Sequence, residues 1–165
     1  MCRPARATVD ATADAVADDP GKAQALFTAT GDAAKGVRTE IRIGRHAVTI
    51  DEPPALGGDD AAINPVESAL AALLSCQVVT YRFWAAKLGI PLTEVHVETE
   101  GDLDVRGFFG LDDAVRPGFT EVRLAVTLRG PAPDADYARL KDTVDDHCPV
   151  LDLFRNTTTV STRLA

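Results

Sequence analysis

The segment from Asn64 to Leu88 constrains the fold more than any other, because it predicts one long helix with almost no polar face. Asn64 is a favoured N-cap residue, and Pro65 suits the first helical position. Gly89 follows the last apolar residue and Pro91 comes soon after, which is typical of a helix end. A helix that is apolar on all faces must be buried on all sides or lie in a membrane.

Polar residues within this helix argue against a membrane partner. Gln77, Arg82 and Lys87 interrupt the apolar run before it reaches the roughly 20 residues that a bilayer requires. We therefore expect a central core helix that is buried in protein. The net charge of -8 and the absence of a Lys/Arg cluster argue against a nucleic-acid partner, because phosphate binding depends mainly on basic side chains.

The composition predicts one folded domain with a short extension. The chain has 165 residues, of which 45% are hydrophobic and 25% charged, and it has no internal repeat. Residues 1–25 predict an N-terminal extension and residues 26–165 a single domain. The three cysteines lack the spacing of a metal site or a disulfide framework, and the first residues lack the pattern of a secretion signal. We expect a cytoplasmic protein without a metal or other cofactor.

Short β-prone segments lie before and after the long helix and predict an α+β fold. Residues 26–30, 37–43 and 46–50 predict an antiparallel meander, because Gly44 and Arg45 suit a two-residue hairpin turn. The alternating patterns predict further strands at residues 94–100, 121–129 and 157–164. Together these segments predict an antiparallel sheet of about six strands around a long buried central helix.

A second helical region contains another cysteine. Residues 133–147 predict an amphipathic helix, and residues 150–156 predict a shorter one. Pro149 disfavours α geometry at Cys148, so the chain should break there and place Cys148 near the start of the shorter helix. A thiolate at a helix N-terminus is stabilised by unpaired amides, whereas a thiol at a C-terminus is less acidic.

The segments NPVESALAALLSC and HCPVLDLF, with LGGDD before the first of them, resemble the OsmC/Ohr family of thiol-dependent hydroperoxide reductases from residue 27 onward. The resemblance implies an intertwined homodimer whose sheets wrap around the two central helices. It implies that Cys76 is the peroxidatic cysteine and Cys148 the resolving one. In the family an arginine of the N-terminal meander stabilises the thiolate, and Arg38 is the nearest candidate. Other candidates for this cation are Lys35, Arg42 and Arg45.

The sequence departs from the family pattern at the start of the helix. In the family a glutamate directly follows the Asn-Pro pair, whereas here Val66 has that position and Glu67 comes next. One residue is about 100° of helix, so Glu67 should point in another direction. Glu67 also has the spacing of a capping box with Asn64, which is a structural role. Cys76 has a structural alternative too, as a small inert core residue.

Two functions are therefore expected. The first is a thiol peroxidase that reduces organic hydroperoxides to alcohols through a Cys76 sulfenate, which Cys148 resolves and a dithiol reductant recycles. The alternative is an OsmC-like dimer without peroxidase activity that binds a small apolar ligand beneath the Gly-rich connection at Phe108 and Phe109. Val66 favours the alternative, and the retained cysteine pair favours the peroxidase.

Overall fold

The computed structural model describes residues 3–164. The chain forms two compact units. The N-terminal unit is Ala11–Ala71, and the C-terminal unit is Ala72–Ala165 with the described part of Met1–Asp10. Helix α2 (Pro65–Leu88) begins in the first unit and continues in the second, with the bounds that the sequence predicts. The predicted boundary at residue 25 stays a prediction.

The N-terminal unit contains the predicted antiparallel meander. Its strands are β1 (Ala29–Ala33), β2 (Thr39–Ile43) and β3 (His46–Ile50), in the spatial order β1-β2-β3. Gly44, with φ of 57°, allows the tight turn between β2 and β3. The helical elements before and after the meander are α1 (Arg3–Asp18), η1 (Pro20–Ala23) and η2 (Pro54–Leu56).

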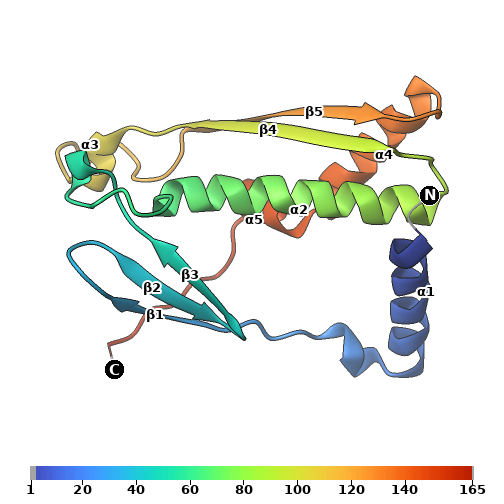
Figure 1. The fold of residues 1–165 in the computed structure, drawn as a ribbon, viewed down its shortest axis with the longest axis horizontal. Coiled ribbons are helices and arrows are strands. Elements are labelled where there is room, and N and C mark those ends of the chain that lie inside the picture. The colour runs from blue at the N-terminus through green and yellow to red at the C-terminus, as the bar shows by residue number, and fades with distance from the viewer. Residues whose placement is uncertain (1–2, 165) are drawn as a thin grey trace. The chain divides into compact units, whose positions relative to one another are not determined.

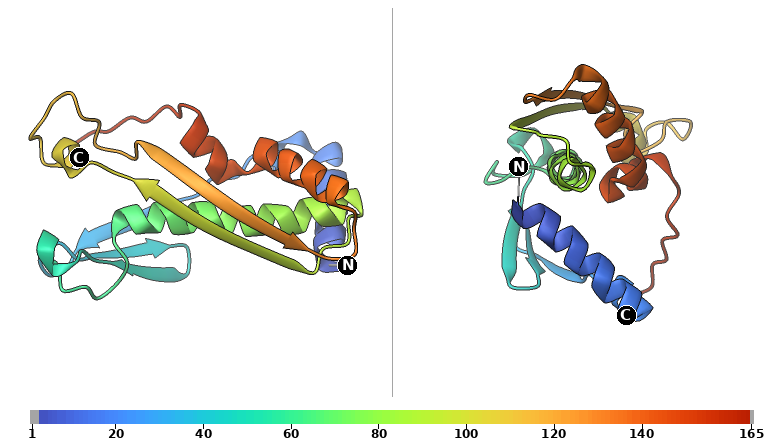
Figure 2. Two further views of the ribbon diagram at one scale, coloured as in Figure 1. Left: turned by 90° about the horizontal axis from the view of Figure 1, so that it is seen from above. Right: turned by 90° about the vertical axis from the view of Figure 1, so that its right-hand side faces the viewer.

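The C-terminal unit packs a β-hairpin and two helices against α2. The hairpin consists of β4 (Glu94–Asp102) and β5 (Glu121–Arg129), which pair antiparallel along their full lengths. The hairpin runs along α2 (Figure 1), while α4 (Asp134–His147) and α5 (Pro149–Arg155) lie on another side of that helix (Figure 2). The connection between the strands holds the short helix α3 (Val105–Phe108).

One hydrophobic cluster joins these elements. Tyr81 of α2 packs with Leu140 and Val144 of α4, and all three side chains are 0% exposed. Val95 of β4 and Val126 of β5 pack against the same cluster. Because Leu140 and Val144 are four residues apart, they lie on one face of α4, as the amphipathic pattern predicts. This cluster fixes α4 against α2, and thereby the position at which α4 ends.

Helix α2 is buried along one face in the single chain, which differs from the expectation that it is buried on all sides. Its buried residues are Leu73, Gln77, Thr80, Tyr81, Ala85 and Ala86. Val79 is 52% exposed, and Ser75 is exposed as well. The reason is that β4, β5, α4 and α5 together cover only part of the helix circumference.

The prediction of about six strands in one sheet is wrong. The described residues form five strands, divided into a three-stranded and a two-stranded sheet. Residues 157–164, predicted to be a strand, have no regular structure and are exposed throughout. Their β-branched residues favour extended backbone, but a strand also needs a neighbour for its hydrogen bonds. No other strand of the described chain pairs with this segment.

By length and composition alone, α2 could cross a membrane. In the most apolar 18-residue stretch of this helix, 33% of the residues are buried inside the protein. The core helix of a water-soluble fold has the same composition, because both environments are apolar. The absence of a membrane partner stays a prediction.

Candidate active site

The structure brings the two predicted cysteines together in the C-terminal unit. Cys148 is 2% exposed and belongs to a cluster with Leu73 and Leu151. Cys76 is half-buried and packs against this cluster. Both thiols are free, and the neighbouring Cys148 raises the pKa of Cys76. A sulfenic acid on one cysteine can therefore meet the thiol of the other, which is the geometry that disulfide formation requires.

Cys148 occupies the junction between α4 and α5. It caps the C-terminus of α4 and the N-terminus of α5, with φ of -84° and ψ of 112°. This extended backbone is what the following Pro149 favours, so the predicted break is confirmed. The side chain of Cys148 makes no capping hydrogen bond to α5. Its thiol is therefore not committed to the helix end and packs beside Cys76.

The thiol of Cys76 is surrounded by groups with opposing effects on its pKa. Burial has the largest effect and raises the pKa above its ordinary value. The Val150 amide lowers the pKa, Cys148 raises it, and the Thr80 hydroxyl lowers it. The net pKa is raised, and none of these groups is a cation. A thiolate at neutral pH therefore needs further stabilisation.

A cavity of about 380 Å³ opens beside the cysteine cluster. Four apolar residues that line it, Leu73, Val122, Leu124 and Leu151, also belong to or pack against the cluster that contains Cys148. Part of the cavity lining is therefore apolar and shared with the cluster that contains Cys148. A molecule with a hydrocarbon body can bury it against these apolar residues.

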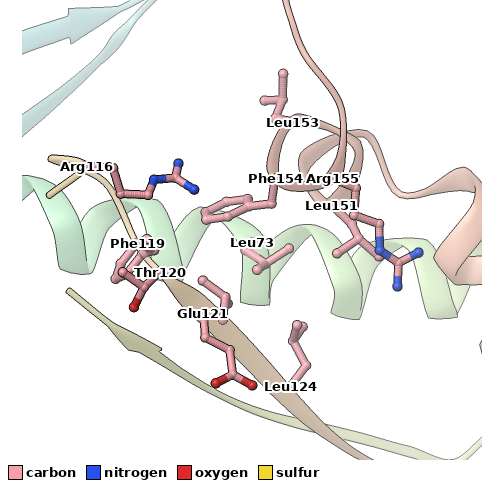
Figure 3. A pocket seen from close by; sticks show the side chains of 11 residues that line it. Leu73, Arg116, Phe119, Thr120, Glu121, Leu124, Leu151, Leu153, Phe154 and Arg155 are labelled. Carbon is pink, nitrogen blue, oxygen red and sulfur yellow. The ribbon is translucent and has the colours of Figure 1, made fainter. Parts of the chain in front are cut away.

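Two aromatic rings and two arginines also line the cavity, together with Thr120, Glu121 and Leu153. Phe154 of α5 extends toward Phe119, which precedes β5 (Figure 3), and their ring centroids are 6.3 Å apart. Gly101 of β4 makes room for Phe119, because a Cβ at Gly101 would lie 2.6 Å from that ring. Arg116 and Arg155 extend at opposite ends of the cavity (Figure 3).

Arg38, the candidate cation, lies in the N-terminal unit and pairs with two carboxylates there. Its Nη2 atom is 3.3 Å from Asp59 Oδ2 and 3.6 Å from Asp51 Oδ2. Asp51 is 1% exposed and also accepts hydrogen bonds from the amides of Asp59 and Ala61. The Nε atom of Arg38 is buried without a hydrogen-bond partner in the described part of the chain. Its predicted role toward Cys76 stays a prediction.

Glu67 forms the capping box that its spacing predicts. Its carboxylate accepts a hydrogen bond of 2.8 Å from the Asn64 amide, and the Glu67 amide donates one of 2.8 Å to Asn64 Oδ1. The structural role of Glu67 is therefore confirmed. A catalytic role for Glu67 stays a prediction.

Sequence reasoning missed several groups that surround the thiols. Thr80 is visible only as a hydroxyl four residues after Cys76, a spacing that places the two on one helix face. The Val150 amide and the Phe119–Phe154 wall carry no sequence signal, since they depend on the position of α5. Phe108 and Phe109, which the sequence does single out, are 67% and 52% exposed. No group of three or more metal-ligating side chains occurs within residues 3–164.

The fold is that of an α+β protein in which the long helix α2 packs beside a β-hairpin. Cys76 of α2 and Cys148, at the junction of α4 and α5, form a dithiol site. The sequence model of the family described as OsmC-like protein matches residues 57–163. The chain therefore belongs to the OsmC-like family, as the motifs around Cys76 and Cys148 indicate. No curated protein matches the chain.

Solved structures support the same fold. An OsmC-like protein from Mycoplasma pneumoniae has a TM-score of 0.68 and 16% identity, covering 80% of this chain and 89% of its own. An organic hydroperoxide resistance protein OsmC from Legionella pneumophila has a TM-score of 0.61 and 21% identity, with coverage of 79% and 90%. An organic hydroperoxide resistance protein from Elizabethkingia anophelis has a TM-score of 0.61 and 18% identity, with coverage of 80% and 89%. At these identities the likeness shows the fold.

Proposed function

We propose that this protein is a thiol peroxidase that reduces organic hydroperoxides to alcohols. The observation that carries the proposal is the pairing of Cys76 with Cys148 in one buried cluster. Inert core cysteines have no reason to occur in contact, whereas a peroxidatic and a resolving thiol must meet. Similar structures named as organic hydroperoxide resistance proteins support the same activity.

The reaction follows from the chemistry of two thiols. The Cys76 thiolate attacks the distal oxygen of the hydroperoxide, so an S–O bond forms, the O–O bond breaks and an alkoxide leaves, taking a proton to become the alcohol. Cys148 then attacks the Cys76 sulfenic acid, which forms the disulfide and releases water. A dithiol reductant restores both thiols by exchange and is itself oxidised to a disulfide.

Ionisation of Cys76 is the step that needs a cation. Burial raises the pKa of Cys76, so its neutral form predominates unless positive charge is added. Arg38 is proposed to supply this charge, and its buried, unpartnered Nε hydrogen is a donor still available for an anion. Asp51 and Asp59 orient the Arg38 side chain through its Nη2 atom. In this proposal Asp51 and Asp59 take over the role of the family glutamate, whose position Val66 occupies in this chain.

The cavity sets the proposed substrate class. The leucines, Val122, Phe119 and Phe154 of its lining suit a hydrocarbon substituent on the peroxide. Hydrogen peroxide has no such substituent and gains no apolar contact. The ligand-binding alternative lacks comparable support, because Phe108 and Phe109 are exposed and do not line this cavity.

We further propose that the protein acts as a homodimer in the cytoplasm. In one chain Val79 of α2 is 52% exposed, although it lies in the middle of the most apolar helix. A second copy packed against α2 would bury this face. A reducing compartment suits an enzyme that must regain two free thiols in each cycle.

The experiment is a peroxide-consumption assay with reduced protein and dithiothreitol as the dithiol. Cumene hydroperoxide should be consumed faster than hydrogen peroxide, by about tenfold or more, since apolar contacts to a hydrocarbon group discriminate by about that factor. Cys76→Ser should reduce consumption to the rate without protein. Cys2→Ser, which changes a residue outside the described chain and the proposed site, is the matched control and should keep full activity.

Equal activity of Cys76→Ser and the unmodified protein would contradict the proposal. A preference for hydrogen peroxide over cumene hydroperoxide would contradict the proposed substrate class.

A further inference from the structure

Arg116 lines one end of the cavity beside the cysteine cluster (Figure 3) and has an uncommitted positive charge. The other arginines between residues 72 and 156 each make a hydrogen bond or an ion pair: Arg82, Arg106, Arg123, Arg129, Arg139 and Arg155. Within the described part of the chain, no side chain or carbonyl pairs with the Arg116 guanidinium. Its five donor hydrogens are therefore available to a bound molecule.

Two glycines hold Arg116 at this end of the cavity. A Cβ at Gly107 would lie 2.6 Å from the Arg116 carbonyl oxygen, so the close approach of α3 to this backbone depends on a residue without a side chain. A Cβ at Gly118 would lie 3.4 Å from Nη2 of Arg116, so the guanidinium packs over that glycine. The arginine therefore has a fixed backbone, and its side chain extends toward the ring of Phe154 (Figure 3).

The other charged groups of the cavity lining are already paired. Arg155 Nη2 is 3.2 Å from Asp145 Oδ2, and Glu121 Oε2 is 2.9 Å from Arg123 Nη1.

The remaining lining connects Arg116 with the cysteine cluster through apolar side chains. Phe119, Phe154 and Leu73 line the same cavity as Arg116, and Leu73 packs in the cluster that contains Cys148. The cavity therefore combines a positive charge at one end with an apolar surface that reaches the cysteine cluster.

We propose that Arg116 is a specificity-determining residue that binds the carboxylate of an anionic organic hydroperoxide. The inference rests on the proposed function and narrows its substrate class. A guanidinium can donate two parallel hydrogen bonds to one carboxylate. The hydrocarbon part of the substrate then lies along Phe119 and Phe154, with its hydroperoxide group toward Cys76. The carboxylate takes no part in the reaction, so the chemistry of the two thiols is unchanged.

The net charge of the chain makes this local cation decisive for selectivity. At -8 the protein as a whole repels anions. A preference for an anionic over a neutral substrate must therefore come from a positive charge at the cavity. An exposed arginine that is only solvated, which is the ordinary case, would produce no such preference. The two interpretations therefore differ in a measurable ratio of rates.

The test compares two peroxides that differ in charge, para-carboxycumene hydroperoxide and its methyl ester. For each, kcat/KM is measured with reduced protein and dithiothreitol. The unmodified protein should prefer the carboxylate. Arg116→Gln should lower kcat/KM for the carboxylate by about tenfold, which corresponds to the lower range for a hydrogen bond to a charged group, and should leave the ester unchanged. Arg139→Gln removes an exposed charge of α4 outside the cavity lining and is the matched control, which should alter neither value.

A binding measurement separates this inference from the proposed function. The compounds para-isopropylbenzoate and para-isopropylbenzamide lack the O–O bond, and ligand-observed NMR measures the dissociation constant of each. The benzoate should bind more tightly than the amide, and Arg116→Gln should abolish the difference. Because the Arg116 side chain is exposed, this variant should keep the melting temperature of the unmodified protein.

Benzoate binding that depends on Arg116, in a protein that consumes no peroxide, would leave the anion site established and count against the proposed function alone. Equal binding of the benzoate and the amide to the unmodified protein would overturn the inference. A ratio of carboxylate to ester kcat/KM that stays the same in Arg116→Gln would also overturn it.

Discussion

At the scale of single residues, the sequence predicts the chemistry-bearing groups better than their surroundings. Cys76 and Cys148 could be paired from their motifs, and Glu67 could be placed in a capping box from its spacing. The groups that set the pKa of Cys76 could not be predicted. The Val150 amide influences the pKa of Cys76 only because α4 ends at Cys148 and α5 begins there, an arrangement that depends on tertiary packing.

Asp51 is another residue that the sequence does not single out. It lies in a segment rich in Pro, Gly and Asp, which predicts a loop, yet it is 1% exposed. The Ala61 amide is the largest influence that lowers the pKa of Asp51, opposed by burial, and the Glu52 and Asp59 amides and Arg38 lower it further. The ionised carboxylate therefore organises the loop that leads into α2 and orients Arg38.

Asp51→Asn should lower the free energy of unfolding at pH 7. The amide side chain cannot form an ion pair with Arg38, and it has only one acceptor oxygen. A carboxyl group with a lowered pKa in the folded state stabilises the fold above its unfolded pKa and loses that effect as pH falls. The difference between Asp51→Asn and the unmodified protein should therefore shrink below the ordinary pKa of 3.8. Urea unfolding at several pH values measures this.

Asp59→Asn is the control for the Asp51 variant, because Asp59 also pairs with Arg38 but is 52% exposed at its side chain. Exposed ion pairs contribute little to stability. A larger loss in Asp59→Asn than in Asp51→Asn would contradict the role given to Asp51.

At the scale of elements, local patterns predict those segments whose partners lie nearby in the sequence. The caps of α2 give its bounds, and alternation gives the bounds of β5. β1 begins three residues after the predicted start, because turn geometry determines its register with β2. Residues 157–164 were predicted as a strand and are irregular. Strand propensity describes a side chain's fit to a sheet, and it cannot supply the neighbouring strand.

At the scale of the whole molecule, one chain leaves too much apolar surface uncovered. Several large apolar side chains are highly exposed, and they occur at both ends of the sequence as well as on α2. They include Leu26 at 90%, Phe27 at 88%, Val79 at 52%, Val160 at 79% and Leu164 at 102% exposed. Exposed apolar residues in such number are typical of a surface that another chain covers.

We therefore predict an obligate homodimer. Because association stabilises the folded state by mass action, the melting temperature should rise with protein concentration. Light scattering at micromolar concentration should give twice the chain mass of 17.5 kDa. A folded monomer at that concentration, with a melting temperature independent of concentration, would contradict the prediction.

The central claim, that Cys76 and Cys148 form a redox pair, is tested most directly by mapping the disulfide that peroxide produces. Reduced protein is treated with one equivalent of cumene hydroperoxide, blocked with an alkylating reagent and digested without reductant. We predict a linked pair of tryptic peptides, residues 46–82 joined to residues 142–155, which dithiothreitol separates. Recovery of Cys76 as the free, alkylated thiol after this treatment would contradict the account.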